Sequence, residues 1–410
     1  MAFLRLAWKN LWRNRRRTLI TLSALSLSLT LGQAHQNLTH GFFVNMVDKG
    51  VRAGSGHLVI SRQAYLPRRD EKLSFSANDL FREVAARPSV LAALPRVYLS
   101  GLAQSSRESR GILLAGVDPA TEFRINPYLK DILATSQLRA SEPSDAMVGS
   151  RLATELGLTS GSKFVVTLQN REGQLVSELF RVRGIVRTGL RDVDRSLVMI
   201  NYQQAAALAG MQGEIHEYAV VLNHADEIDE VQADIEILLA ARPGLKLSTW
   251  EEAMPGIANA MRLNSGIQSF EIALLLVIIT IGVVNTLLMS VMERVREFGI
   301  IQAMGGTPGW LYRLIFTEAL LLGITGVVVG TLFGILATCY LARYGLDLRP
   351  FLPDTMEFGG VVYDPVIYAE WSVVAMLRLA LYLLGLSLVA SIYPARNATR
   401  ITPVDAMRHC

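Results

Sequence analysis

The sequence predicts an α-helical membrane protein with four transmembrane helices and a large α/β domain inserted between the first and the second. The chain has 410 residues, of which 51% are hydrophobic and 19% charged. This balance is too apolar for most soluble proteins and too polar for a protein that lies wholly in lipid. Four apolar stretches approach or exceed the about 20 residues that a helix needs to cross a bilayer. A polar stretch of roughly 200 residues, long enough for a folded domain, separates the first from the second.

The chain begins with an amphipathic segment, residues 1–17, in which AWKNLWRNRRR places Trp8 and Trp12 one helical turn apart at a membrane interface. The first transmembrane helix and a stalk follow over residues 18–47. Because its apolar part is short and serine-rich, we expect the helix to continue past Asn37 as a more hydrated stalk. A cleaved signal peptide is the alternative, but no small-residue cleavage site follows the apolar run.

Residues 48–268 are expected to form the external α/β domain. Period-two alternation predicts strands in HLVISRQAY, KFVVTLQN and LFRVRGIVRT. A helix that Asp226 caps should follow AVVLNHAD, with one apolar stripe made of Ile228, Val231, Ile235 and Leu238. Residues 145–215 carry several strand patterns of their own and are a candidate inserted subdomain.

Three further apolar stretches complete the membrane part. The expected order is a second span at 269–292, a turn at 293–310, a third span at 311–341, a short external loop at 342–370, a fourth span at 371–394 and a tail at 395–410. Glu318 and Arg378 lie inside the third and fourth spans, at depths about 10 Å apart. That separation argues against a direct pair between them, so we expect packing or snorkelling roles rather than a proton relay.

Basic residues indicate the orientation of the spans, because Lys and Arg gather on the cytoplasmic side. They precede the first span, flank the turn and follow the fourth span, at Arg5, Lys9, Arg13, Arg15, Arg16, Arg17, Arg294, Arg296, Arg313, Arg396, Arg400 and Arg408. Both termini are therefore expected in the cytoplasm and the large domain outside it.

No enzyme motif is recognisable. The string nearest to a phosphate-binding loop, GLTSGSKF from Gly157, has Gly-Ser-Lys where Gly-Lys-Ser/Thr is required, so we expect a turn leading into a strand. His216 and His224 are eight residues apart, whereas a zincin helix needs four. Two cysteines, Cys339 and Cys410, argue against a disulfide framework or a Cys-ligated zinc site. We therefore expect no catalytic residue, no cofactor and no metal on this chain, and a net charge of only +4 gives no case for nucleic acid.

The turn after the second span has an unusual pattern, NTLLMSVMERVREFGIIQAMGGTP. On a continuous helix Val291, Val295 and Phe298 share one face, which would lie against the membrane. The opposite arc would carry Glu293, Arg294, Arg296 and Glu297 and then, with further turns, Ile300, Ile301 and Met304. An apolar cluster among charges is typical of a partner surface.

The third span contains two consecutive GxxxG steps, at Gly326, Gly330 and Gly334. Such glycines let another helix approach closely, so we expect helix packing here.

These segments, together with LIFTEALLLGITGVVVG, the tail SIYPARNATRITPVDAMR and the N-terminal LAWKNLWRNRRRT, resemble the FtsX/MacB superfamily of ABC-transporter permeases, also called type VII. Within it, the size of the chain, the single large external domain and GSGHLVISRQAY resemble the lipoprotein-releasing permeases of the LolC/LolE type. The resemblance implies that residues of the turn couple to a separate ATPase: Glu293, Arg294, Arg296, Glu297, Phe298, Gly299, Ile300, Ile301, Met304 and Gly305. It also assigns Pro394, Ala395, Arg396, Pro403 and Ala406 to a C-terminal family motif.

The resemblance further implies a bacterial inner-membrane location and a mechanotransmission machine. Two ATPase subunits would bind ATP and Mg, and a second, identical or related permease would complete the assembly. A periplasmic carrier or adaptor, an amphipathic cargo such as a lipoprotein, and membrane lipids are the other implied partners. Two alternatives stay open, which are MacB-like export of peptides, toxins or drugs and FtsX-like regulation of a cell-wall hydrolase.

Overall fold

The computed structural model describes residues 2–76, 78–129, 144–188, 191–211, 213–350, 356–358, 361–363 and 365–400. The chain forms two compact units. Unit 1 contains residues 1–44, 262–351 and 366–410, and unit 2 contains residues 45–261 and 352–365.

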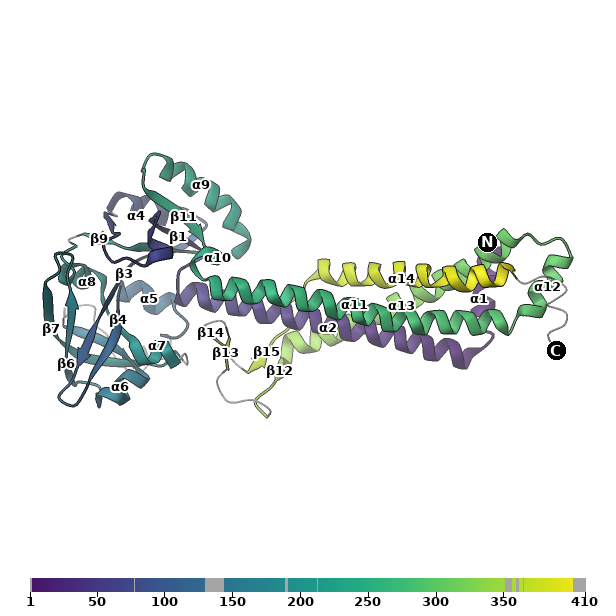
Figure 1. Ribbon diagram of the computed structural model, residues 1–410, viewed down its shortest axis with the longest axis horizontal. Helices are drawn as coiled ribbons and strands as arrows, with labels where there is room; N and C mark the ends of the chain where they lie inside the picture. The colour runs from purple at the N-terminus through teal and green to yellow at the C-terminus, as the bar shows by residue number, and fades with distance from the viewer. Residues whose placement is uncertain are drawn as a thin grey trace. The chain divides into compact units, whose positions relative to one another are not determined.

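Unit 1 consists mainly of helices, four of them long (Figure 1). They are α1 (Ala2–Leu11), α2 (Arg15–Ala53), α11 (Pro255–Met292), α12 (Val295–Ala303), α13 (Pro308–Tyr344) and α14 (Val373–Arg400), of which α2 and α11 continue into unit 2. Among the described helices α11, α13 and α14 are long and apolar enough to cross a membrane. Helix α2 has 39 residues, but serine, threonine and glutamine interrupt its apolar run. Short strands β12 (Leu346–Asp347) and β15 (Val366–Ile367) pair between α13 and α14.

The core of unit 1 takes buried side chains from four helices. Leu25 and Leu29 of α2 pack with Val283 of α11, Leu322 of α13 and Leu379 of α14. Helix α2 is therefore an integral member of this helical unit although it is the least apolar of the four.

Polar side chains of α2 point into this unit and account for its composition. Gln33 and Asn37 are both fully buried. Asn37 Nδ2 donates to Thr338 Oγ1 over 3.0 Å, and Asn37 Oδ1 accepts from the backbone N–H of Ser372 over 3.1 Å. Thr30 Oγ1 donates to the carbonyl oxygen of Gly330 over 3.0 Å. Helix α2 continues past Asn37 to Ala53, as predicted. The expectation that it is hydrated at Asn37 is wrong, because Thr338 and the backbone of Ser372 satisfy this amide within the protein.

The glycines of α13 give α2 its close approach. A Cβ atom at Gly330 would lie 2.9 Å from both the Cβ of Leu29 and the carbonyl oxygen of Ser26, and one at Gly326 would lie 3.1 Å from the Cβ of Leu25. Gly334 faces Gln33 in the same way. The helix that the GxxxG steps admit is therefore α2 of the same chain.

Unit 2 is built on a nine-stranded sheet with the order β11-β1-β10-β3-β4-β8-β5-β7-β6. Its strands are β1 (Leu58–Arg62), β3 (Val90–Gln104), β4 (Ser109–Val117), β5 (Asp145–Gly149), β6 (Lys163–Gln169), β7 (Leu175–Val186), β8 (Leu197–Asn201), β10 (Glu217–Leu222) and β11 (Leu245–Thr249). Two small pairs accompany it, β2 (Phe75–Ser76) with β9 (Glu214–Ile215) and β13 (Met356–Phe358) with β14 (Val361–Tyr363). Helices α3 (Tyr65–Arg68), α4 (Asn78–Ala85), α5 (Pro119–Ile125), α6 (Ser150–Leu156), α7 (Arg191–Ser196), α8 (Tyr202–Leu208), α9 (Ile228–Ala240) and α10 (Trp250–Ala253) surround them.

Strand β3 serves two parts of this sheet because it is 15 residues long. Its first half pairs with β10, and its second half pairs with both β4 and β6. The β3–β6 pairing closes β3, β4, β8, β5, β7 and β6 into a ring. Residues 145–215 therefore do not form a separate strand set, because their strands complete a ring that needs β3 and β4.

Several local patterns fold as their sequence predicts. Phe180, Val182 and Val186 are the buried positions of β7, and GLTSGSKF forms a helix end and a turn before β6. In α9 the buried stripe is Val231, Ile235 and Leu239. Asp226 does not cap this helix, because a short 3₁₀ turn precedes it and Glu227 takes the cap position without a side-chain hydrogen bond.

Candidate functional site

The segment between α11 and α13, residues 293–307, is here named the α12 turn. Helix α11 ends at Met292, and α12 begins at Val295. Arg294 interrupts the helical path with a φ of −116°. This break changes the direction in which the charged side chains point, so a helical wheel drawn through it misplaces them.

The other end of the α12 turn depends on two glycines. Gly305 has a φ of +95°, a conformation that L side chains rarely adopt. A Cβ atom at Gly306 would lie 2.7 Å from the carbonyl oxygen of Ile301. The pair permits a sharp return of the chain into α13, whose first residue is Pro308.

The inner face of the α12 turn is part of a protein core. Val291 and Phe298 are almost completely buried, as is Val295 beside them. Their surroundings are Ala7 of α1, Leu311, Leu314 and Ile315 of α13, and Ala395 and Ala398 of α14. The expectation that this face lies against the membrane is therefore wrong. Phe298 and the neighbouring Gly299 are buried, so they support the turn and offer no contact surface.

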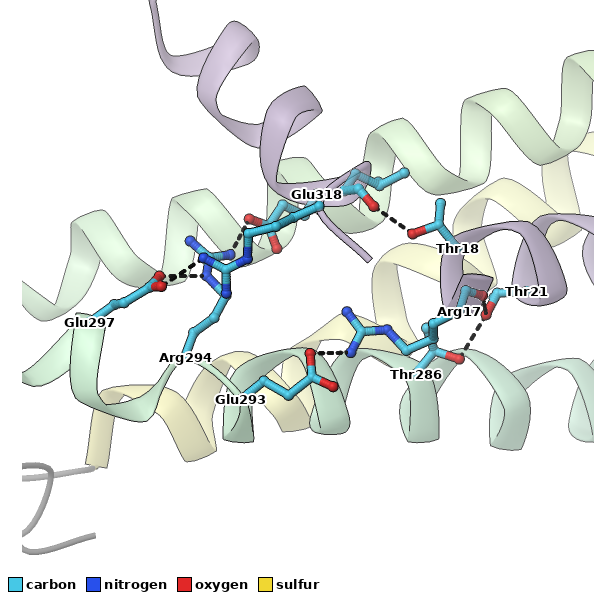
Figure 2. A network of polar contacts seen from close by, with 10 residues as sticks. Arg17, Thr18, Thr21, Thr286, Glu293, Arg294, Glu297 and Glu318 are labelled. Carbon is cyan, nitrogen blue, oxygen red and sulfur yellow. Dashed lines mark hydrogen bonds and ion pairs between the residues drawn. The ribbon is translucent and has the colours of Figure 1, made fainter. Parts of the chain in front are cut away.

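The side chain of Arg294 points inward, toward α13. Its Nη1 donates to Glu318 Oε1 over 2.8 Å, and each side chain is only 7% exposed (Figure 2). The guanidinium also lies 4.9 Å from the ring centre of Phe298. Two predictions fail here, because Arg294 does not lie on the outer arc and Glu318 has an ion-pair partner in place of a packing or snorkelling role.

Helix α1 also contacts the buried pair of Arg294 and Glu318. Asn10 Nδ2 donates to Glu318 Oε1 over 2.9 Å, so this carboxylate receives a side-chain hydrogen bond from α1 and another from the α12 turn. Charges buried in this way are tolerated only when they are paired and hydrogen-bonded. The arrangement fixes the positions of α1, α13 and the α12 turn relative to one another.

Two more ion pairs connect Arg13, which lies between α1 and α2, and Arg17, at the start of α2, to the α12 turn. Arg13 Nη1 lies 2.6 Å from Glu297 Oε1, and Arg17 Nη1 lies 2.7 Å from Glu293 Oε2. Burial alone would raise the pKa of Glu297, but hydrogen bonds from Arg13 and Arg294 outweigh it, so the pKa of Glu297 is lowered. A hydrogen bond of 2.9 Å between Thr21 and Thr286 continues these contacts along α2 and α11.

Sequence reasoning missed this second set of contacts. The orientation argument uses Arg13 and Arg17 only for their positive charge. They are, however, four residues apart, as are their partners Glu293 and Glu297. Matching i, i+4 spacings of opposite charge were the available signal.

The outer face of the α12 turn combines apolar and charged side chains. Ile300 is 46% exposed and Met304 76% exposed. Arg296 and Gly305 are exposed beside them, and Ile301 is half-buried. Exposed apolar side chains of this kind, set among charges, are typical of a surface that another protein covers.

The C-terminal motif contributes to the inner side of the turn. Pro394 and Ala395 are buried inside α14, whereas Arg396 is exposed. Helix α14 continues to Arg400 rather than ending at residue 394. Pro403 and Ala406 lie outside the described residues.

Comparisons with known families match both parts of the chain. The FtsX-like permease C-terminal family matches residues 269–403, and the MacB-like periplasmic core domain family matches residues 18–238, more than half of the chain. The chain is a permease of the FtsX/MacB superfamily. Its α12 turn lies within the FtsX-like region.

Similar proteins include three that illustrate the range of relatives of this permease. It is 25% identical to the lipoprotein-releasing system transmembrane protein LolC of Neisseria meningitidis, over 81% of each chain. It is 19% identical to LolE of Haemophilus influenzae, over 80% of each chain. It is 24% identical to the macrolide export ATP-binding/permease protein MacB of Sodalis glossinidius, over 85% of this chain and 48% of MacB. The permease is thus similar to LolC and LolE over about four-fifths of its length, and MacB is also among its relatives.

The α12 turn offers a contact surface. No group of three or more His, Cys, Asp or Glu side chains within the described ranges is placed to hold a metal ion. The α12 turn instead combines a rigid inner face with an exposed outer face.

Proposed function

We propose that this permease extracts lipoproteins from the bacterial inner membrane and passes them to a periplasmic carrier, driven by a separate ATP-hydrolysing subunit. The coupling to the ATP-hydrolysing subunit is argued from the α12 turn. Ile300 and Met304 offer an apolar docking surface, while Phe298 and the Arg294–Glu318 pair join that surface to α1, α13 and α14. A partner that moves α12 would therefore move these helices with it, which is the physical content of mechanotransmission.

The transporter would contain two copies of the ATPase, which bind ATP and Mg, and a second permease, identical or related. We propose that α2, α11, α13 and α14 all cross the membrane with both chain termini in the cytoplasm. The basic residues before α2 and around the α12 turn support this orientation. The contacts of Asn37 support a membrane position for α2, because they satisfy both atoms of its amide within the protein.

The lipoprotein cargo is supported by similarity to LolC and LolE over about four-fifths of the chain. Depleting the permease in its host should leave lipoproteins in the inner-membrane fraction. Unchanged fractionation would remove the support for this cargo.

MacB-like export of a peptide, toxin or drug is the second candidate, because the chain aligns with MacB over 85% of its length. Under this alternative, an adaptor protein should copurify with the permease and lipoprotein fractionation should stay normal after depletion. The two candidates thus predict opposite results in the same strain.

A further inference from the structure

Unit 2 contains two adjoining cavities of similar size. The first has a volume of about 380 Å³ and the second about 370 Å³, which is within the range of small-molecule sites. Both are lined by Gly54, Tyr98, Leu113 and Met254. The two spaces therefore meet along a common wall.

The first cavity has mainly apolar walls. Strands β4 and β8 contribute Leu113, Ala115, Val117, Leu197 and Met199, and the start of α11 contributes Ile257. These side chains offer no hydrogen-bonding groups, so they favour a hydrocarbon occupant.

The polar groups of the first cavity include a neutralised ion pair. Arg96 Nη2 lies 3.0 Å from Glu122 Oε1, and each side chain is 2% exposed. Arg96 Nη1 donates to the carbonyl oxygen of Gly54, but Arg96 Nε is buried and has no hydrogen-bond partner among the described residues. A buried N–H without a partner costs free energy.

The charges of Arg96 and Glu122 determine which kind of ligand oxygen fits beside them. Because Glu122 already neutralises Arg96, an anionic ligand group here would add an unpaired charge in an apolar space. A neutral ester or amide carbonyl would lie beside this pair without that cost.

The second cavity has three charged side chains in its lining, Arg69, Glu71 and Glu217. It is lined by the ion pair of Arg69 and Glu217, whose Nη1 and Oε2 atoms are 3.0 Å apart, and by Glu71. Ser55 also lines it, and the buried Ser55 Oγ has no partner among the described residues. Two carboxylates against one guanidinium disfavour an anionic group and suit a neutral or zwitterionic one.

We propose that these two cavities form one site for an amphipathic acyl compound. Its hydrocarbon chain occupies the first cavity, its ester or amide carbonyl lies beside the neutralised Arg96–Glu122 pair, and its uncharged or zwitterionic head occupies the second. A membrane phospholipid and an acylated protein both supply this chemistry. Only the acylated-protein source rests on the proposed function.

The full-length permease in lipid nanodiscs provides the test. Phosphatidylethanolamine with a photoreactive diazirine on one acyl chain is incorporated, illuminated, and mapped on the protein by mass spectrometry. Parallel arms use phosphatidylglycerol with the same chain and a protein that carries the same photoreactive acyl group. Labelling by phosphatidylethanolamine identifies a membrane lipid as a source, and labelling by the acylated protein alone identifies cargo.

Two variants block the common wall in different ways. Leu113→Arg places a charge there, at a side chain that is 41% exposed, and Met254→Trp adds bulk without charge. Leu179→Arg is the matched control, because Leu179 is 49% exposed on β7 and lines neither cavity. All three are compared with the wild type in thermal unfolding before labelling.

We expect peptides of β4, β8 and α5 to be labelled in the wild type and in Leu179→Arg. Labelling should fall roughly tenfold in the blocked variants, and phosphatidylglycerol should label less than phosphatidylethanolamine. Labelling confined to the helices of unit 1, or equal labelling of unit 2 in wild type and both blocked variants, would overturn the proposal. Stronger labelling by phosphatidylglycerol would overturn the placement of the head.

Discussion

Arg294 Nη1 donates a hydrogen bond to Glu318 Oε1 over 2.8 Å, and this buried pair joins the α12 turn to α13. Replacing Arg294 by Ala should destabilise unit 1 by about 3–5 kcal/mol, because it leaves the Glu318 carboxylate buried without its cation. The double variant Arg294→Met with Glu318→Leu should lose less, since neither charge remains. Thermal unfolding in detergent measures the stability loss of the single and of the double variant. Arg296→Ala, at an exposed position of the same helix, is the control, and an Arg294→Ala variant as stable as this control would contradict the role of the pair.

The outer face of α12 should be required for coupling rather than for folding. Met304→Glu places a charge on a side chain that is 76% exposed, so the fold should be retained while ATPase binding weakens at least about tenfold. Copurification with the ATPase subunit measures the binding. Ile237→Glu, at an equally exposed position on α9, should bind normally. If Met304→Glu also binds normally, the docking surface lies elsewhere.

Close approach of α2 to α13 should depend on Gly330. Gly330→Ala should destabilise the permease by about 1–3 kcal/mol, because the added methyl group would crowd Leu29 and Ser26. Gly385→Ala in α14 meets nothing within 4 Å and should be neutral or slightly stabilising. Denaturation of the two variants in the same detergent tests the difference, and equal stability would show that α2 is not held at this distance.

The stability of unit 2 should fall in mild acid because of a buried histidine. Burial lowers the pKa of His57 to about 4, and its Nδ1 accepts a hydrogen bond from the backbone N–H of Leu222 over 3.1 Å. The neutral ring is therefore the native form. Its contribution to stability is complete above pH 6.5, the unfolded value, and is lost as the pH falls toward 4.

Between pH 6.5 and 5 this loss should reach about 2 kcal/mol. Unfolding of wild type and His57→Gln at pH 7.5 and 5.0 measures it, because the substitution should reduce the acid sensitivity. His40→Gln changes an exposed histidine of unit 1 and should leave the sensitivity unchanged. The same acid sensitivity in wild type and His57→Gln would exclude His57 as its source.

Local patterns were sufficient to predict much of the fold. The alternation of apolar and polar residues predicts the buried positions of β7, and the apolar stripe with Val231 and Ile235 predicts α9. Both patterns depend only on residues that are close in sequence. Contacts between distant segments were not predictable in this way. Arg294 points inward because the helix breaks just before Val295, and its partner Glu318 is 24 residues away.

The same limit applies to Asn37 and to β3. Asn37 is buried because Thr338 and Ser372 lie beside it, and neither partner is visible from its neighbourhood in sequence. The ring that contains β3 closes only through the pairing of β3 with β6, more than 60 positions later. The outer face of the α12 turn was the most predictable part of the candidate site, since isoleucine and methionine among charges are a local signal.

The central claim is that this permease couples ATP hydrolysis to lipoprotein release through the α12 turn. The most direct measurement is ATP-dependent transfer of an acylated lipoprotein from reconstituted vesicles to a soluble carrier. Vesicles would contain the permease, its partner permease and the ATPase. The account predicts transfer with the wild type, loss of transfer with Met304→Glu and normal transfer with Ile237→Glu. Equal transfer from vesicles that lack this permease, or from vesicles with Met304→Glu, would contradict it.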